Sequence, residues 1–263
     1  MRKVQVLLVA GAASALTALV TLVGMAGAEA NVVPANTEAP TVVGTASDGQ
    51  LVVAKDGEWS GTNPMTFTYQ WLRCDGNGAN CATIAGATAQ TYRVVTADVD
   101  HRLKVSVTAR NVTGTASATS RGSAAVARPA GATRLADGRY SIPATSVQLP
   151  ERLVISGVEF APRVLNSRQS FTGRFRVTDT RGYVVRDAIV LVTGVPLGWI
   201  LQPQEVKTNV DGLVTLQLQP TTRLRLVRGG SMVMFLRARK DGDSILAGIS
   251  SRRLVRVRTA SPS

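Results

Sequence analysis

Residues 66–73 constrain the fold of this 263-residue chain more than any other segment. Phe67, Tyr69 and Trp71 share one parity, and polar residues occupy the positions between them. In a β-strand, alternate side chains point to opposite faces, so all three aromatic rings lie on one face. Because such a face needs a second sheet to cover it, the segment predicts a β-sandwich.

The chain has two cysteines, Cys74 and Cys81, directly after this strand. A pair of cysteines in a secreted chain is expected to form a disulfide. The closed loop is short, so its entropic contribution is about 2.5 kcal/mol. We therefore predict a local staple across a hairpin, and not a bridge between two sheets.

Residues 1–30 carry the pattern of a secretory signal peptide. A basic start at Arg2 and Lys3 precedes a long apolar stretch, and Ala28-Glu29-Ala30 fits the small-residue cleavage pattern. The alternative is an uncleaved N-terminal membrane anchor that leaves the rest of the chain outside the cell. The predicted location is therefore secreted or extracellular, with contact to the membrane only if this segment is uncleaved.

Short alternating segments separated by turn signals such as Ser47-Asp48-Gly49 and Asp179-Thr180-Arg181-Gly182 continue to the C-terminus, without a convincing helix. This spacing predicts an all-β protein with two sandwiches in series. The expected boundaries are a first sandwich over 31–128, a linker over 129–137 and a second sandwich over 138–259.

The first half resembles the immunoglobulin-like repeats of secreted actinobacterial proteins. The resemblance covers about residues 40–125, and Asp100 stands where such repeats usually carry glycine. The matching residues are Gly57, Trp59, Gly61, Tyr69-Gln70-Trp71, Arg73-Cys74, Cys81, Ile84, Gly86-Ala87-Thr88, Tyr92, Ala97-Asp98, Leu103, Val105, Val107-Thr108-Ala109, Asn111 and Gly114.

The second half is similar to bacterial immunoglobulin-like domains of the invasin or carboxypeptidase-regulatory kind. The similarity covers about residues 150–220 and rests on Phe175-Arg176-Val177-Thr178-Asp179, Gly182, Val185, Ala188-Ile189-Val190 and Thr208-Asn209-Val210-Asp211-Gly212. Both resemblances imply extracellular display, adhesion or spacing, and neither supplies a catalytic residue.

Positive charge is concentrated in the second half. Residues 31–130 hold 8 Lys+Arg against 7 Asp+Glu, whereas residues 131–263 hold 20 against 9. A basic half of this kind could attract an anionic cell-envelope polymer. The alternative is compositional, because arginine outnumbers lysine 25 to 5 and the arginines are spread along the chain.

The predicted polyanion contact lies on two segments near the C-terminus. If these two segments pair as strands, their basic side chains form a ladder suited to phosphate or carboxylate oxygens. The alternative is a solvated outer face opposite the core positions Met232, Met234 and Leu236. The basic residues concerned are Arg223, Arg225, Arg228, Arg237, Arg239 and Lys240.

Two tryptophans in predicted loops, Trp59 and Trp199, are candidates for stacking against a sugar or small ligand. The competing interpretation is packing, which we favour for Trp59. Leu197, Trp199 and Ile200 could also form an apolar loop tip that touches a partner.

Catalysis, metal binding and cofactors have little support. His101 is the only histidine, so a Ser-His-Asp triad would depend on it, and a zinc site lacks ligands. The acidic turns Asp98–Asp100 and Asp241–Asp243 each offer two carboxylates, whereas calcium takes six or more oxygens. We predict no enzyme, metal or cofactor, and no nucleic-acid partner.

The sequence therefore predicts a structural or interaction protein of the cell surface. Its immunoglobulin-like modules would act as spacer or adhesion units, and the basic second module would contact an anionic envelope polymer or another surface protein. The alternative is a module that binds a glycan or small ligand through its loop tryptophans.

Overall fold

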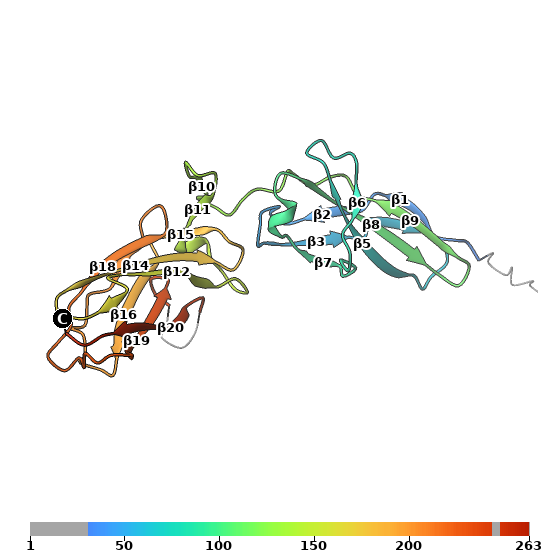
Figure 1. Cartoon of the computed structure of the whole chain (residues 1–263). Helices are drawn as coiled ribbons and strands as arrows, with labels where there is room; N and C mark the ends of the chain where they lie inside the picture. Colours follow the sequence, from blue (N-terminus) through green and yellow to red (C-terminus); the bar gives the residue numbers. More distant parts are fainter. Residues whose placement is uncertain (1–30, 244–247, 263) are drawn as a thin grey trace, which may run out of the picture.

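The computed structural model describes residues 31–243 and 248–262. The predicted signal peptide lies outside these residues. Apart from two single-turn 3₁₀ segments, Thr96–Asp98 and Ala144–Ser146, the regular secondary structure of the described chain is all β-strand. It forms two immunoglobulin-like sandwiches joined end to end, the first at the right and the second at the left in Figure 1.

The first sandwich packs a three-stranded sheet, β2-β3-β7, against a four-stranded sheet, β6-β5-β8-β9, and β1 pairs separately with β4. The strands are β1 (Ala35–Glu38), β2 (Thr41–Val43), β3 (Leu51–Lys55), β4 (Glu58–Ser60), β5 (Thr66–Cys74), β6 (Ala82–Thr83), β7 (Thr91–Arg93), β8 (Arg102–Arg110) and β9 (Thr115–Thr119). The loop predicted around Trp59 contains a short strand, β4, because its backbone pairs with the N-terminal strand β1.

The core of the first sandwich confirms the aromatic face of β5. Trp71 is fully buried, and its ring stacks on Tyr92 with 5.5 Å between centroids. Phe67 and Tyr69, on the same face of β5, are partly buried and pack against the same cluster. Leu103, Val105 and Val107 on β8, the strand that pairs with β5, complete the cluster.

The turn before β8 keeps a tight geometry without glycine. Asp100 has φ = 67°, in the left-handed region that aspartate tolerates better than most residues. Its carboxylate accepts hydrogen bonds from Arg128. The departure from the repeat pattern at this position therefore leaves the turn intact.

The second sandwich packs two larger sheets. One has the order β10-β11-β15-β14-β12 with β18 also paired to β14, and the other has the order β13-β20-β19-β16-β17. The strands are β10 (Thr133–Arg134), β11 (Tyr140–Pro143), β12 (Leu153–Ala161), β13 (Val164–Leu165), β14 (Phe171–Asp179), β15 (Val184–Arg186), β16 (Ile189–Val195), β17 (Val206–Lys207), β18 (Leu213–Leu218), β19 (Gly230–Arg239) and β20 (Ser251–Thr259).

The core of the second sandwich is separate from that of the first. Phe171, Phe175 and Val177 on β14 face Met232, Met234 and Leu236 on β19, and all six side chains are buried. The core positions predicted for Met232, Met234 and Leu236 are confirmed, and β14 alternates buried with more exposed side chains in the same way. β12 is one continuous strand with a bulge between Ile155 and Gly157.

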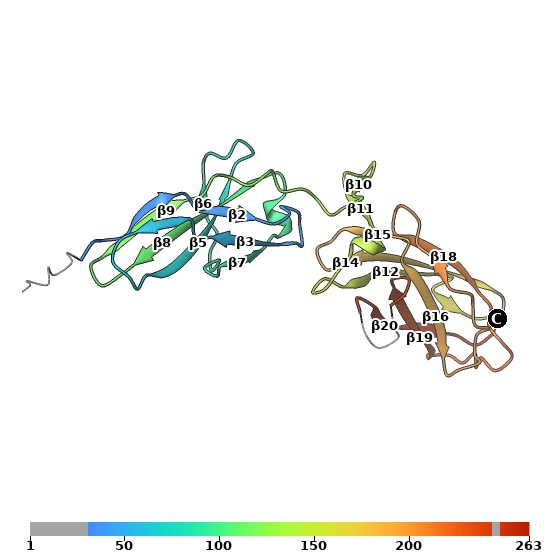
Figure 2. The same cartoon turned by 180° about the vertical axis from the view of Figure 1, so that it is seen from behind.

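One strand lies inside the expected linker. Thr133 and Arg134 form β10, which pairs with β11 in the second sandwich, so the segment between the two sandwiches is shorter than 129–137. Figure 2, seen from behind, shows the same single connection between the two bodies. The exact domain boundaries stay predictions.

Candidate functional site

The disulfide joins Cys74 at the end of β5 to Cys81 just before β6. These two strands pair in the same sheet, with Arg73 opposite Ala82. The predicted local staple is thus confirmed, because the bond closes one hairpin and links no second sheet.

Asp98, considered above as a calcium ligand, is instead a buried acceptor. Arg73 donates from Nε at 2.7 Å, the Tyr92 hydroxyl donates at 2.9 Å, and the Val95 amide donates at 2.9 Å. These donors use both carboxylate oxygens. They take the place of water, because the Asp98 side chain has no exposed surface. Asp98 therefore anchors the turn that leads into β8.

The two loop tryptophans have different surroundings. Trp59 is half-buried; its ring lies 6.1 Å from that of Phe67, and its indole N–H donates to the Asp56 carbonyl at 2.8 Å. Trp199 is also half-buried and packs against the second core. At the proposed loop tip, Leu197 is 75% exposed but Ile200 is 5% exposed, so the three side chains do not form one apolar surface.

The expected basic ladder is not formed. β19, which carries Arg237 and Arg239, pairs with β16 and β20. The segment with Arg223, Arg225 and Arg228 is the connection before β19 and contains no strand. Its three arginines are exposed. The condition on which the ladder depended is thus not met, because the strands that flank β19 come from other parts of the chain.

The basic residues on β19 are also partly engaged within the protein. Arg237 is 5% exposed, which contradicts a solvated outer face at this position. Arg239 pairs with Glu205, and this hydrogen bond raises the pKa of the guanidinium. Lys240 is half-buried directly after the strand.

A second buried polar cluster lies where the two sandwiches meet. Asp48, in the turn before β3, has a side chain with no exposed surface. Its Oδ2 accepts hydrogen bonds from Thr96 in the first sandwich at 2.8 Å and from the Tyr183 hydroxyl of the second at 2.9 Å. One carboxylate therefore joins the two domains, and we call this cluster, Asp48, Thr96, Asp179, Arg181 and Tyr183, the joint.

Arg181 provides the positive charge of the joint. Its Nη1 donates to the Asp48 carbonyl at 3.1 Å and lies 3.6 Å from Asp48 Oδ1, while its Nε donates to Asp179 Oδ2 at 2.8 Å. Gly49 makes this approach possible, because a Cβ there would lie 2.8 Å from Nη1. Burial raises the pKa of Asp179, and the charge of Arg181 opposes that rise.

The Tyr183 hydroxyl group of the joint is also buried. Burial, followed by the hydrogen bond to Asp48, raises the pKa of Tyr183. Beside it, the Arg128 guanidinium lies 4.2 Å above the Tyr140 ring, a cation–π contact across the same connection. The ion pair Arg181–Asp48, the hydrogen bond from Tyr183 to Asp48 and the cation–π contact of Arg128 with Tyr140 therefore all join the second sandwich to the first.

Sequence reasoning found Ser47-Asp48-Gly49 and Asp179–Gly182 as turns, but did not bring them together. Both are ordinary turn signals. Asp48 and Arg181 are 133 residues apart in the sequence, and nothing in either segment indicates that the other lies beside it. The available signal was weak: an arginine and a tyrosine close together in a turn, where exposed polar residues are usual.

Within residues 31–243 and 248–262, no helix is long and apolar enough to cross a membrane. The same residues contain no group of three or more His, Cys, Asp or Glu placed to hold a metal ion.

No protein-family profile matches the chain, and no curated protein matches it. Among solved structures, the chain is similar to an I-band fragment of titin, with a TM-score of 0.28 and 14% identity over 86% of this chain and 65% of that one. It is also similar to the D0-D1 domain of intimin, with a TM-score of 0.26 and 14% identity over 84% of this chain and 97% of that one.

A tandem repeat in the extending region of a large adhesion protein is similar as well, with a TM-score of 0.27 and 14% identity over 86% of this chain and 50% of that one. The chain thus spans less than two thirds of the titin fragment and half of the adhesion repeat. The assignment of two immunoglobulin-like sandwiches rests on the sheets and cores described above.

Proposed function

We propose that this protein is a cell-surface structural and interaction protein in which a stiff pair of immunoglobulin-like sandwiches holds the basic second sandwich outward. The joint carries this proposal. A flexible spacer would leave the facing ends of its domains solvated, whereas here a fully buried carboxylate accepts hydrogen bonds from both sandwiches.

An extracellular location is part of the proposal. The disulfide Cys74–Cys81 supports it, because disulfides persist in oxidising compartments and are rare in the cytosol. Secretion through residues 1–30, or anchoring by them, belongs to the same proposal.

The proposed partner is an anionic polymer of the cell envelope. The excess of 20 Lys+Arg over 9 Asp+Glu in residues 131–263 supports an electrostatic attraction that salt should weaken. Stacking of a ligand on Trp59 has less support, because that ring and its N–H already have partners within the protein.

The stiffness is tested by measuring distances between spin labels on the two sandwiches of the full-length protein. Labels introduced through an unnatural amino acid at Val112 and Thr215, both exposed, avoid the disulfide. A narrow distance distribution is expected. Asp48→Ala should broaden it, because Thr96 and Tyr183 lose the carboxylate oxygen that accepts hydrogen bonds from both, and Arg181 loses its ionic contact with that carboxylate.

Glu205→Ala is the matched control, since it also removes one carboxylate from an arginine but lies away from the joint. A broad distribution in the unaltered protein, or no change on Asp48→Ala, would show that the joint does not set the domain arrangement. Partner binding is tested separately, by co-sedimentation with isolated cell envelopes at low and high salt.

A further inference from the structure

The edge of the second sandwich offers a more specific site than the residues singled out in the sequence. β12 is the edge strand of one sheet, with β14 as its only neighbour. β20 lies at the edge of the other sheet apart from its end, where the two-residue strand β13 pairs with Arg258 and Thr259. The two edges lie side by side, because Arg253 Nη1 donates to the Ile155 carbonyl at 2.6 Å.

Three adjoining cavities follow this edge. The first, about 350 Å³, lies on the outer face of β12 and β14; the second, about 590 Å³, lies between β12 and β20; the third, about 690 Å³, lies beside β13 and β20. Glu159 and Arg174 line both the first and the second, and Arg256 lines both the second and the third. The three cavities therefore adjoin one another along this edge, and together they are here called the edge cleft.

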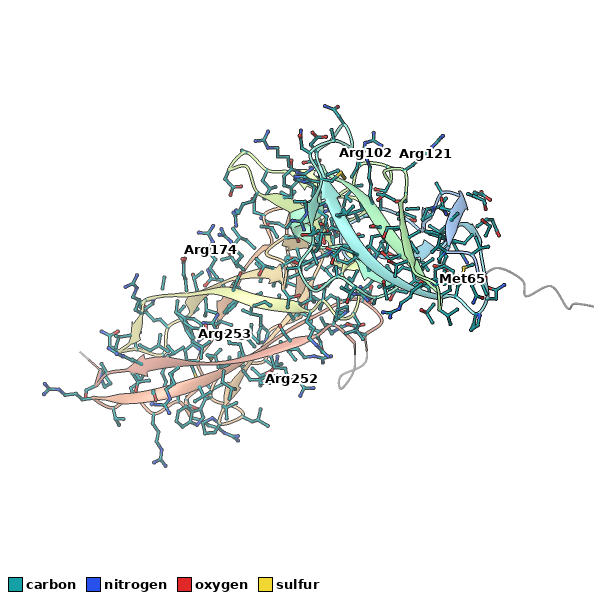
Figure 3. All side chains as sticks on the ribbon, turned by 90° about the vertical axis from the view of Figure 1, so that its right-hand side faces the viewer. Met65, Arg102, Arg121, Arg174, Arg252 and Arg253 are labelled. Carbon is teal, nitrogen blue, oxygen red and sulfur yellow. A yellow bond between two sulfur atoms is a disulfide. The ribbon has the colours of Figure 1, made fainter. Side chains whose placement is uncertain are left out.

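Arginines dominate the polar lining of the edge cleft. They are Arg139, Arg163, Arg174, Arg176, Arg256 and Arg258, with Glu159 as the single carboxylate. In Figure 3, Arg174 and Arg253 are labelled on the same side of this sandwich, on its yellow and red strands.

Most of these guanidinium groups have no hydrogen-bond or ion-pair partner among residues 31–243 and 248–262. Among the described residues, only Arg139 is paired, with Asp137. The other five make no side-chain hydrogen bond or ion pair there, and four of them are exposed. Arg163, Arg174 and Arg256 are therefore free to contact a ligand.

The floor of the cleft is built around Arg176. Its Nε is buried and has no acceptor among the described residues. Gly157, opposite it on β12 at the bulge, leaves the space above it open, since a Cβ there would lie 3.1 Å from the Arg176 Cβ. Arg176 is half-buried and lines the first cavity, so it adds positive charge to the floor of the cleft.

The spacing of the charges indicates an extended ligand. Arg174 and Arg176 alternate on β14, as Arg256 and Arg258 do on β20, and alternate residues on a strand lie about 7 Å apart. A chain with anionic groups repeated at comparable intervals could meet several guanidinium groups in turn.

The other lining groups favour a polyhydroxylated chain over a nucleic acid. Ser156, Thr172 and Thr178 offer hydroxyl groups, and Glu159 can accept hydrogen bonds from sugar hydroxyls. The one aromatic ring that lines the cleft, Phe160, packs on Phe171 and Phe175. No ring in the described lining is therefore free to stack on bases, as single-stranded nucleic acids require.

We propose that the edge cleft binds a linear polyhydroxylated polymer that carries phosphate or carboxylate groups, along β12, β14 and β20. This inference rests on the proposed function, and adds to it a site, a set of residues and the chemistry of the partner. The arginines would provide charge-assisted hydrogen bonds to the anionic groups, and the hydroxyl and carboxylate groups would contact the sugar or polyol backbone.

The test compares two triple variants of the full-length protein by titration with polygalacturonate, a glycerol-phosphate polymer, neutral dextran and single-stranded DNA. The cleft variant is Arg163→Gln, Arg174→Gln and Arg256→Gln. The control is Arg223→Gln, Arg225→Gln and Arg228→Gln, which removes the same charge from exposed arginines of the same sandwich.

We expect the cleft variant to bind at least one anionic polymer more than tenfold more weakly, with a smaller salt dependence, while the control changes binding less than about threefold. The two polymers distinguish carboxylate from phosphate recognition, and dextran should not bind. Lysine at the three cleft positions should restore part of the affinity, because the charge returns without the planar fork. Unchanged thermal unfolding of both variants excludes misfolding.

The outcomes separate the two proposals. No binding of either anionic polymer or of cell envelopes by the unaltered protein overturns the proposed partner and the cleft together. Binding that both variants weaken equally leaves the partner in place and overturns the cleft, whose arginines would then only protect an edge strand from pairing with other chains. Tighter binding of DNA than of both polymers overturns the class of ligand.

Discussion

The two sandwiches use their charged residues in different ways. In the first, Asp98 satisfies Arg73, Tyr92 and a backbone amide, and Asp100 pairs with Arg128. In the second, most arginines of the edge cleft have no hydrogen-bond or ion-pair partner for their side chains in the part of the chain that the structure describes. The comparison shows that the second sandwich, besides internal pairs such as Arg181–Asp179 and Arg239–Glu205, carries a group of exposed arginines that are available to a ligand.

The largest effect on stability should come from substitutions that disrupt one hydrophobic core and leave the other intact. Trp71→Ala removes the largest side chain of the first core and should lower its free energy of unfolding by about 3–5 kcal/mol. Phe175→Ala should do the same to the second. Hydrogen exchange read separately for each sandwich should show loss of protection mainly in the domain that carries the change. Equal loss in both would show that the domains unfold as one unit.

The buried carboxylate of the first sandwich gives the next effect. Asp98→Ala leaves Arg73, the Tyr92 hydroxyl and the Val95 amide without an acceptor, so we expect a loss of about 3 kcal/mol. Asp100→Asn, two residues on, removes the charge of a carboxylate that is 70% exposed and keeps a residue that tolerates the left-handed backbone, so it should cost about 0.5 kcal/mol. Urea denaturation of both variants measures the difference, and similar losses would contradict the anchoring role of Asp98.

The disulfide should contribute somewhat less. Replacing Cys74 and Cys81 together by serine should destabilise the first sandwich by about 2.5 kcal/mol, because the bond restricts only a short loop in the unfolded chain. The second sandwich should keep its stability. Thermal unfolding followed by domain-specific probes tests this, and a loss in the second sandwich would show that the staple acts beyond its hairpin.

The smallest effect is a dependence on alkaline pH. Burial, then the hydrogen bond and charge of Asp98, raises the pKa of Tyr92 from 10.0 to about 12. Because the folded state holds this proton more tightly, the contribution is complete below pH 10 and is lost as the pH rises toward 12. Tyr92→Phe should reduce the fall in stability across this window, measured by urea denaturation. An unchanged fall would assign it to other groups.

Sequence patterns predicted the strands well and the charged contacts poorly. The alternation of Phe67, Tyr69 and Trp71 fixes which face is buried, because strand geometry has a strict period of two. Register and neighbours have no such local rule. Arg237 and Arg239 were placed correctly on a strand, but the strands beside it come from residues 189–195 and 251–259.

The sequence by itself determined the all-β character, the aromatic core of the first sandwich, the local disulfide and the uneven charge. Each of these depends on residues close together in the chain or on composition alone. The tertiary structure decided which charges are used internally and which remain exposed. It brought Asp48 to Tyr183 across the joint and lined one edge with arginines from β12–β13, β14 and β20. Long-range pairing sets these contacts, because a charged side chain acts on whatever the fold places within a few ångströms of it.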